Sequence, residues 1–226
     1  MELKNILKNG TSISSSGTTG PAKQIYQSPD KIKHANQVAR DVQKITSTSK
    51  IYTVCKLDHA GGLLAQTLPA IEIDADVHLE QFNPFRWVSN IQYFTHSHLT
   101  PGMALAITKT KGWNNLDLSN KIIACGSDRV PAECINKFLD KGATFITNWG
   151  MSEIGPIAIN KIYTPLDSQA FDLPLHTIMG DTAYCDTKII RHELHVKGNI
   201  CVYDDWFATG DIVKFEKGCY WYYGRK

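Results

Sequence analysis

The chain has 226 residues, of which 42% are hydrophobic and 20% charged, as is typical of a globular protein with one domain or one domain and a small appendage. Its 24 basic and 22 acidic residues are well mixed and give a net charge of +2, so we expect no nucleic-acid partner. Residues 1–10 do not resemble a signal peptide, and no apolar run reaches the roughly 18 residues of a membrane helix. We therefore expect a cytoplasmic protein that does not bind membranes.

Residues 28 to about 144 alternate between helix-like and strand-like stretches. A capping residue followed by proline marks a helix start at Ser28, Asn83 and Thr100. Further helices are predicted for residues 62–71 and 131–141, and strands for residues 51–55, 75–79, 121–125 and 143–147. This alternation predicts an α/β fold: a layered, largely parallel sheet flanked by helices.

The pattern changes after about Pro165. Residues 188–203 alternate as a strand does, and so do residues 212–223 on both sides of a turn at 216–218. We expect a small antiparallel β subdomain at the C-terminal end. The predicted division is therefore a core over residues 1–165 and a β-rich subdomain over residues 166–226.

The cysteines and histidines offer little support for a metal centre. The six cysteines include no C-x-x-C pair, so we expect reduced, mostly buried thiols. His192, Glu193 and His195 invite a metal interpretation, but they lie in an alternating strand and lack the H-E-x-x-H spacing.

A run of hydroxyl, glycine and lysine residues near the amino terminus is suited to binding a polyphosphate. Glycines allow backbone N–H groups to approach phosphate oxygens, and hydroxyls and a lysine add donors. The run is not a Walker loop, because its glycines are three apart and Gln24 stands where a Ser or Thr is needed. A surface linker is the alternative. The residues concerned are Ser15, Ser16, Gly17, Thr18, Thr19, Gly20 and Lys23.

The run from Ser15 to Lys23 resembles the phosphate loop of the adenylate-forming superfamily, which includes acyl-CoA synthetases, luciferases and peptide-synthetase adenylation domains. Three further motifs follow in that family's order. Residues 148–153 resemble its aromatic-Gly-x-Thr-Glu motif, with tryptophan and serine as departures. Residues 206–211 resemble its Trp-x-x-Thr-Gly-Asp segment, and residues 223–225 the Gly-Arg step before its hinge. Residues 125–131 are similar to its loop beside adenine.

The resemblance implies a role for each matching residue. Trp149 would stack on adenine, Ser152 would contact the α-phosphate, and Glu153 would hold Mg²⁺, with Thr18 as a second candidate ligand. Asp211 would accept hydrogen bonds from the ribose hydroxyls. The candidate catalytic residues are Lys23, His59, Ser152 and Glu153. The candidate ATP- or AMP-binding residues are Ser15, Ser16, Gly17, Thr18, Thr19, Gly20, Lys23, Gly126, Ser127, Asn148, Trp149, Gly150, Met151, Ser152, Asp211 and Arg225.

Residues 58–62 and 95–101 most resemble the o-succinylbenzoate-CoA ligase branch, although the arginine expected in the helix after His59 is absent, with Leu68 or its neighbours in that place. Within these segments, His59 and His96 are either substrate-facing or structural. The sequence leaves both readings open.

The implied activity is ATP-dependent activation of a small carboxylic acid to its acyl-adenylate. The family's long segment before the phosphate loop and its carboxy-terminal domain, which supplies a catalytic lysine, have no counterpart in this sequence. We therefore expect slow adenylation, with inefficient use of CoA. The alternatives are a module that binds a nucleotide or acyl-adenylate without efficient turnover, completed by a homodimer partner or another chain, and a purely structural protein.

Overall fold

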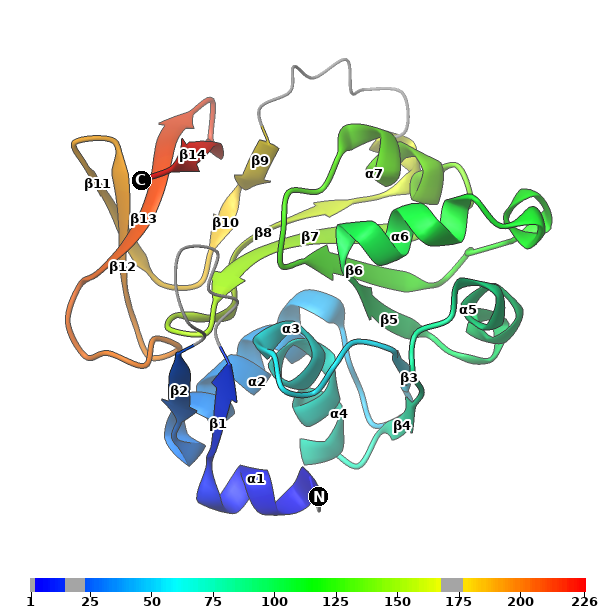
Figure 1. Cartoon of the computed structure of the whole chain (residues 1–226), viewed down its shortest axis with the longest axis horizontal. Helices are drawn as coiled ribbons and strands as arrows, with labels where there is room; N and C mark the ends of the chain where they lie inside the picture. Colours follow the sequence, from blue (N-terminus) through cyan, green and yellow to red (C-terminus); the bar gives the residue numbers. More distant parts are fainter. Residues whose placement is uncertain (1–2, 15–22, 168–176) are drawn as a thin grey trace.

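A seven-stranded, largely parallel sheet forms the centre of the molecule (Figure 1). The computed structural model describes residues 3–14, 23–167 and 177–226. The strand order is β10-β8-β7-β6-β5-β3-β4. Strands β3 to β7 are parallel, β8 is antiparallel to β7, and β10 is antiparallel to β8. The predicted layered α/β fold is confirmed. The strands are β3 (Lys50–Thr53), β4 (Asp76–Leu79), β5 (His96–Leu99), β6 (Ile122–Gly126), β7 (Thr144–Met151), β8 (Gly155–Tyr163) and β10 (Thr182–Ala183).

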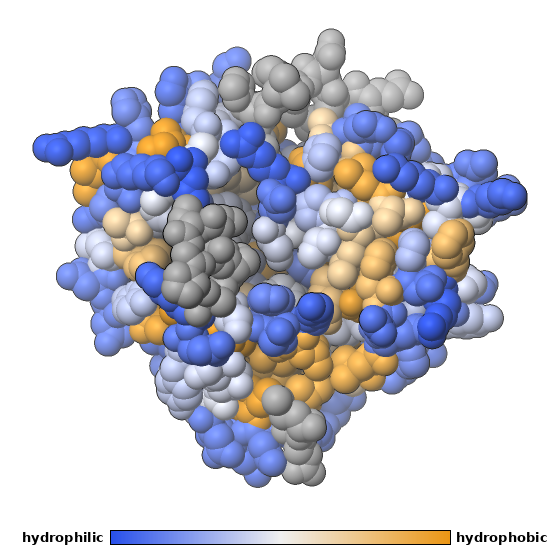
Figure 2. All heavy atoms as spheres, viewed as in Figure 1, coloured by the Kyte–Doolittle hydropathy of each residue, from blue (hydrophilic) through white to orange (hydrophobic). Residues whose placement is uncertain are grey.

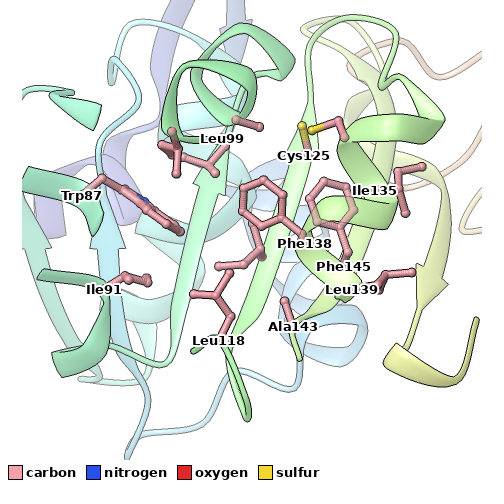
Figure 3. Packing of buried hydrophobic residues seen from close by; sticks show 14 of the residues in the cluster. Trp87, Ile91, Leu99, Leu118, Cys125, Ile135, Phe138, Leu139, Ala143 and Phe145 are labelled. Carbon is pink, nitrogen blue, oxygen red and sulfur yellow. The ribbon is translucent and has the colours of Figure 1, made fainter. Parts of the chain in front are cut away.

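One face of this sheet is covered by α5 (Pro84–Asn90), α6 (Pro101–Thr108) and α7 (Ala132–Leu139), with the short helices η2 (Ile91–Tyr93) and η3 (Lys111–Asn115) between them. The largest core cluster lies in this layer (Figure 3). Phe138 of α7 packs against Trp87, Trp113 and Phe145, with ring centroids 4.9–6.2 Å apart. Burial of such large aromatic surfaces stabilises the attachment of the helices to the sheet.

The opposite face is covered by α2 (Pro29–Gln43) and by the segment α3 (Ala60–Gly62), η1 (Leu63–Thr67) and α4 (Leu68–Glu72). Ser28 caps α2 through its hydroxyl, which accepts from the Lys31 N–H at 3.3 Å. Ala39 and Val42 of α2 cluster with Ala124 and Ile146 of the sheet. The predicted helix start at Ser28 is therefore confirmed, with the helix's apolar side toward the strands.

At the amino terminus, α1 (Leu3–Asn9) leads into a two-stranded antiparallel hairpin of β1 (Thr11–Ser14) and β2 (Gln24–Gln27). Ile13 and Ile32 are buried with Leu63 and Leu64, so the hairpin packs on α2 and η1. Residues 15–22, which join the two strands, lie outside the described part of the chain.

A separate five-stranded antiparallel sheet has the order β11-β12-β13-β14-β9. Its buried face contributes Met179, Leu194, Val196 and Val213 to a core shared with Ile159 of β8. The two sheets therefore pack on one another and enclose space between them. Its strands are β9 (Thr177–Gly180), β11 (Asp186–Ile190), β12 (Glu193–Lys197), β13 (Phe207–Glu216) and β14 (Cys219–Arg225).

Three strands of the central sheet were missing from the sequence-based prediction: β5, β8 and the two-residue β10. All four residues of β5 are buried, yet two are histidines and one is a serine. Their polar atoms are used inside the core: the Trp87 indole N–H donates to Ser97 Oγ at 3.0 Å, and His96 Nε2 donates to the Gln43 carbonyl at 2.8 Å. The single alternating stretch predicted over residues 188–203 is also wrong, because a left-handed turn at Arg191 and His192 splits it into β11 and β12.

All six cysteines lie in described segments, and none of them forms a disulfide. Among the described residues, no helix has both the length and the apolar character needed to cross a bilayer.

Candidate active site

A pocket of about 930 Å³ opens at the carboxyl ends of the parallel strands. The segments that follow β3, β5 and β6 contribute Cys55, Thr100 and Ser127, and the end of β7 contributes Trp149. Asp211 enters from β13 of the second sheet. Open α/β sheets bind ligands at this edge, because the loops there diverge and leave a crevice.

Most of the predicted site residues meet in this pocket. Those that line it are Lys23, His59, Ser127, Asn148, Trp149, Gly150, Met151, Ser152, Glu153, Asp211 and Arg225. Gly126 is not among the lining residues: a Cβ there would lie 2.7 Å from the Asn148 carbonyl oxygen, so this glycine permits close approach of β6 and β7. Ser15, Ser16, Gly17, Thr18, Thr19 and Gly20 lie outside the described residues, whereas Ser14 and Lys23 at either end of that run line the pocket.

A hydrogen bond joins the side chains of Trp149 and Asp211. The indole N–H donates to Asp211 Oδ2 at 3.0 Å, and Arg225 Nε lies 3.8 Å from Oδ1. Asp211 is buried, with 4% of the residue's surface exposed. Burial raises the pKa of Asp211, while the bond from Trp149 and the positive charge of Arg225 oppose that rise.

The turn that presents Asp211 is held by β12. Gly210 has φ +78°, a conformation that glycine adopts without strain, and its N–H donates to Glu193 at 2.9 Å. The Thr209 hydroxyl donates to the Leu194 carbonyl at 2.8 Å. Lys226 donates to Glu193 at 2.5 Å and holds the pKa of that carboxyl below its usual range. Both carboxylate oxygens of Glu193 therefore accept hydrogen bonds within this turn region. The described residues contain no group of three or more His, Cys, Asp or Glu suited to a metal.

The β1–β2 hairpin is fixed to the pocket through Ser14. Its N–H donates to the Asp58 carbonyl at 3.0 Å. Its carbonyl accepts from His59 Nδ1 at 3.3 Å and from the Ser152 hydroxyl at 3.4 Å. Ser14, the last residue of β1, therefore lies at the pocket wall.

Glu153 follows Ser152 in the β7–β8 turn, and its backbone is held there by a bond from the Val202 N–H to its carbonyl at 2.8 Å. Its side chain lines the pocket. Mg²⁺ in nucleotide sites is commonly bound by one or two carboxylates together with substrate phosphates. One carboxylate at this position fits such an ion.

The far end of the pocket, beyond β5 and β3, is sulfur-rich. Cys55 Sγ lies 3.7 Å from the Met103 sulfur and 3.6 Å from His98 Nδ1. Burial raises the pKa of Cys55 to about 12 and lowers that of His98 to about 4, so both are neutral. A Cβ on Gly61 would lie 3.0 Å from both His98 and Ser127, so glycine keeps this end open.

The structure gives different positions to His59 and His96, for which the sequence allowed either a substrate-facing or a structural role. His59 lines the pocket at the start of α3. His96 is buried in β5 and bonded to Gln43, and burial lowers its pKa. His96 is therefore structural.

Sequence reasoning missed several pocket residues. Cys55, Met103 and Met179 lie in no motif, and of the three only Cys55, at the end of a predicted strand, had a sequence signal. Tyr222 also lines the pocket, where the Arg129 guanidinium lies 4.6 Å from its ring centroid and links the two sheets.

Two curated relatives, both named feruloyl-CoA synthase, come from Amycolatopsis sp and Streptomyces sp. Each is 29% identical to this chain over 116 residues, which is 50% of this chain and 24% of the relative. The chain thus spans about a quarter of the length of these relatives.

Solved structures share the fold. The adenylation domain of a keto acid-selecting NRPS module, bound to keto acyl adenylate, has a TM-score of 0.80 at 17% identity over 95% of this chain and 51% of that one. The inhibitor-bound N-terminal domain of FACL13 from Mycobacterium tuberculosis has a TM-score of 0.78 at 15% identity, covering 95% and 60%. E. coli MenE with an analogue of OSB-AMS has a TM-score of 0.75 at 16% identity, covering 95% and 47%.

A family model described as AMP-binding enzyme matches residues 12–210, a range that contains all but the first residue of the hairpin, the β7–β8 turn and the turn before Asp211. This chain belongs to the AMP-binding enzyme family.

Proposed function

We propose that this chain binds ATP in the pocket and activates a carboxylic acid as its acyl-adenylate. The main support for this proposal is that residues from position 23 to position 225 converge on one pocket. Four cations and three carboxylates line it, namely Lys23, Lys56, Arg129 and Arg225 against Asp128, Glu153 and Asp211. The small positive balance favours an anionic nucleotide.

In this proposal the nucleotide lies over β6 and β7. Trp149 stacks on the adenine, Asp211 and Arg225 receive the ribose, and Lys23 and Ser152 contact phosphate oxygens. Glu153 would hold Mg²⁺, which neutralises phosphate charge when bound. The Ser152 hydroxyl is suited to its role because its bond to Ser14, at 3.4 Å, is long enough for a phosphate oxygen to compete for the proton.

The acid lies toward β5 and β3, roughly 10–15 Å from the adenine site if adjacent strands are about 4.8 Å apart. His59 would orient its carboxylate, one oxygen of which attacks the α-phosphorus while pyrophosphate leaves. Positioning the reactants in line, together with the cations around the phosphates, lowers the barrier.

We further propose that the acid is aromatic. Cys55 and Met103 line the acid end of the pocket, and sulfur atoms make favourable contacts with aromatic rings. The curated relatives are named for feruloyl-CoA, whose acyl group carries an aromatic ring, and residues 58–62 and 95–101 resemble a branch that takes another aromatic acid. Transfer of the acyl group to CoA would be a second step, outside the contacts described here.

Exchange of labelled pyrophosphate into ATP tests adenylation directly. With a panel of aromatic and aliphatic acids, we expect exchange that needs both the acid and Mg²⁺ and is fastest for aromatic acids. Nucleotide binding in calorimetry without exchange for any acid would reject turnover and leave the binding module. Absence of both would reject the nucleotide pocket as well.

A further inference from the structure

The position of Trp149 allows one side chain to serve two parts of a nucleotide. It is half-buried and lines the pocket, so part of its ring borders the cavity, and its edge donates the indole N–H to Asp211. A phenylalanine would keep an aromatic face but could not make this bond.

The surroundings of Asp211 explain why the bond matters. Its neighbours are Arg225 on β14 and Glu193 on β12, and Glu193 in turn pairs with Lys226 and lies 3.7 Å from His195. Burial and the negative charge of Glu193 both favour the protonated form of Asp211. The indole N–H and Arg225 are the two groups that favour the ionised form.

We propose that Trp149 is a positioning residue for Asp211, whose carboxylate it holds ionised and oriented so that Oδ1, beside Arg225, is left to accept hydrogen bonds from the ribose hydroxyls. This inference rests on the proposed nucleotide binding. The bond at 3.0 Å fixes one carboxylate oxygen and thereby the direction of the other. Recognition of the base and of the ribose is then coupled through a single side chain.

The coupling is tested with two ligands, AMP and 2′,3′-dideoxy-AMP, which differ only in the ribose hydroxyls. In the wild-type protein we expect AMP to bind more tightly. Trp149→Phe should weaken both ligands through poorer stacking, but AMP by a further factor of about ten, because hydrogen bonds to charged groups are worth about that much. Binding is measured by calorimetry.

Trp221→Phe is the matched control. Trp221 lies on β14, in the five-stranded sheet that carries Asp211. Its indole N–H donates to the Glu216 carbonyl at 3.1 Å, and it does not line the pocket. We expect it to leave the ratio of the two affinities unchanged. In an Asp211→Ala background, Trp149→Phe should no longer change that ratio, because the side-chain acceptor of the indole N–H is gone.

The pH dependence gives a second readout. AMP affinity should fall on acidification as Asp211 is protonated, and in Trp149→Phe this fall should begin at higher pH because the pKa of Asp211 rises further. Dideoxy-AMP carries the same phosphate and corrects for its titration. If Trp149→Phe does not fold, Trp149→Met, which also lacks a donor, replaces it.

The measurements distinguish the positioning role of Trp149 from nucleotide binding itself. Equal losses for the two ligands together with an unchanged pH profile would overturn the positioning role while leaving nucleotide binding intact. Failure of the wild-type protein to bind either ligand would instead reject the proposed function.

Discussion

Asn148 and Asn36 are two buried asparagines whose side-chain amides have no hydrogen-bond partner among the described residues. Asn148 lines the pocket and is 7% exposed, whereas Asn36 lies on α2, is fully buried and does not line the pocket. A buried amide without a partner costs about 1–3 kcal/mol. Replacing either residue with leucine, which has a similar branched shape, should therefore stabilise the free protein.

We expect a gain of about 2 kcal/mol for Asn148→Leu, less whatever the larger leucine costs by overpacking near Gly126. In a chain of this size, that gain raises Tm by roughly 4–8 °C. Asn36→Leu should gain at least as much, since leucine is also the better helix former by a few tenths of a kcal/mol. Both are measured by thermal and urea unfolding without nucleotide.

The two variants should differ in binding. Asn148→Leu should lose AMP affinity, because the pocket amide is removed, while Asn36→Leu should bind AMP as the wild-type protein does. A clear drop in Tm for Asn148→Leu alone would show that its amide already has a partner in the free protein. A stabilised Asn148→Leu with unchanged AMP affinity would remove Asn148 from the nucleotide site.

Three further predictions concern Glu153, Gly61 and His98. Glu153→Gln should weaken Mg-ATP at least tenfold and leave AMP binding in EDTA unchanged, which calorimetry measures; unchanged Mg-ATP affinity would contradict the assignment. Gly61→Ala places a methyl 3.0 Å from His98 and Ser127, so exchange should fall more for aromatic acids than for acetate, and a uniform fall would argue against an acid site there. Burial lowers the pKa of His98 from 6.5 to about 4. As pH falls from 6.5 to 4, the unfolded chain therefore binds a proton that the folded protein does not, and the free energy of unfolding falls by about 3 kcal/mol. The free energy of unfolding, measured with urea across this range, should depend less on pH in His98→Gln than in the wild-type protein. Equal pH dependence in the two proteins would contradict the lowered pKa of His98.

The fold class and most helix starts could be predicted because they depend on local signals. Ser28, Asn83 and Thr100 each cap a helix with a side-chain oxygen, and each is followed by proline. Strand β5 could not be predicted in the same way. Its histidines and serine find partners on Tyr52, Gln43 and other distant residues, and no local pattern reveals those partners.

The candidate site was predictable wherever short motifs carry it, as at residues 148–153 and 209–211. Its acid end was not, because Cys55 and Met103 come together only when β3 and β5 pair. The Trp149–Asp211 bond joins residues 62 positions apart. Hydrogen-bond partners of this kind depend on the packing of one sheet on another, which periodicity does not encode.

The carbonyl of Ser14 accepts from His59, at the start of α3, and from Ser152, in the β7–β8 turn. Two donors from distant stretches of the chain thus share a single acceptor oxygen. Any event that draws the Ser152 hydroxyl away would leave His59 with a stronger bond and a more strongly fixed ring. A change at the Ser152 hydroxyl would in this way reach the neighbouring imidazole through one peptide oxygen.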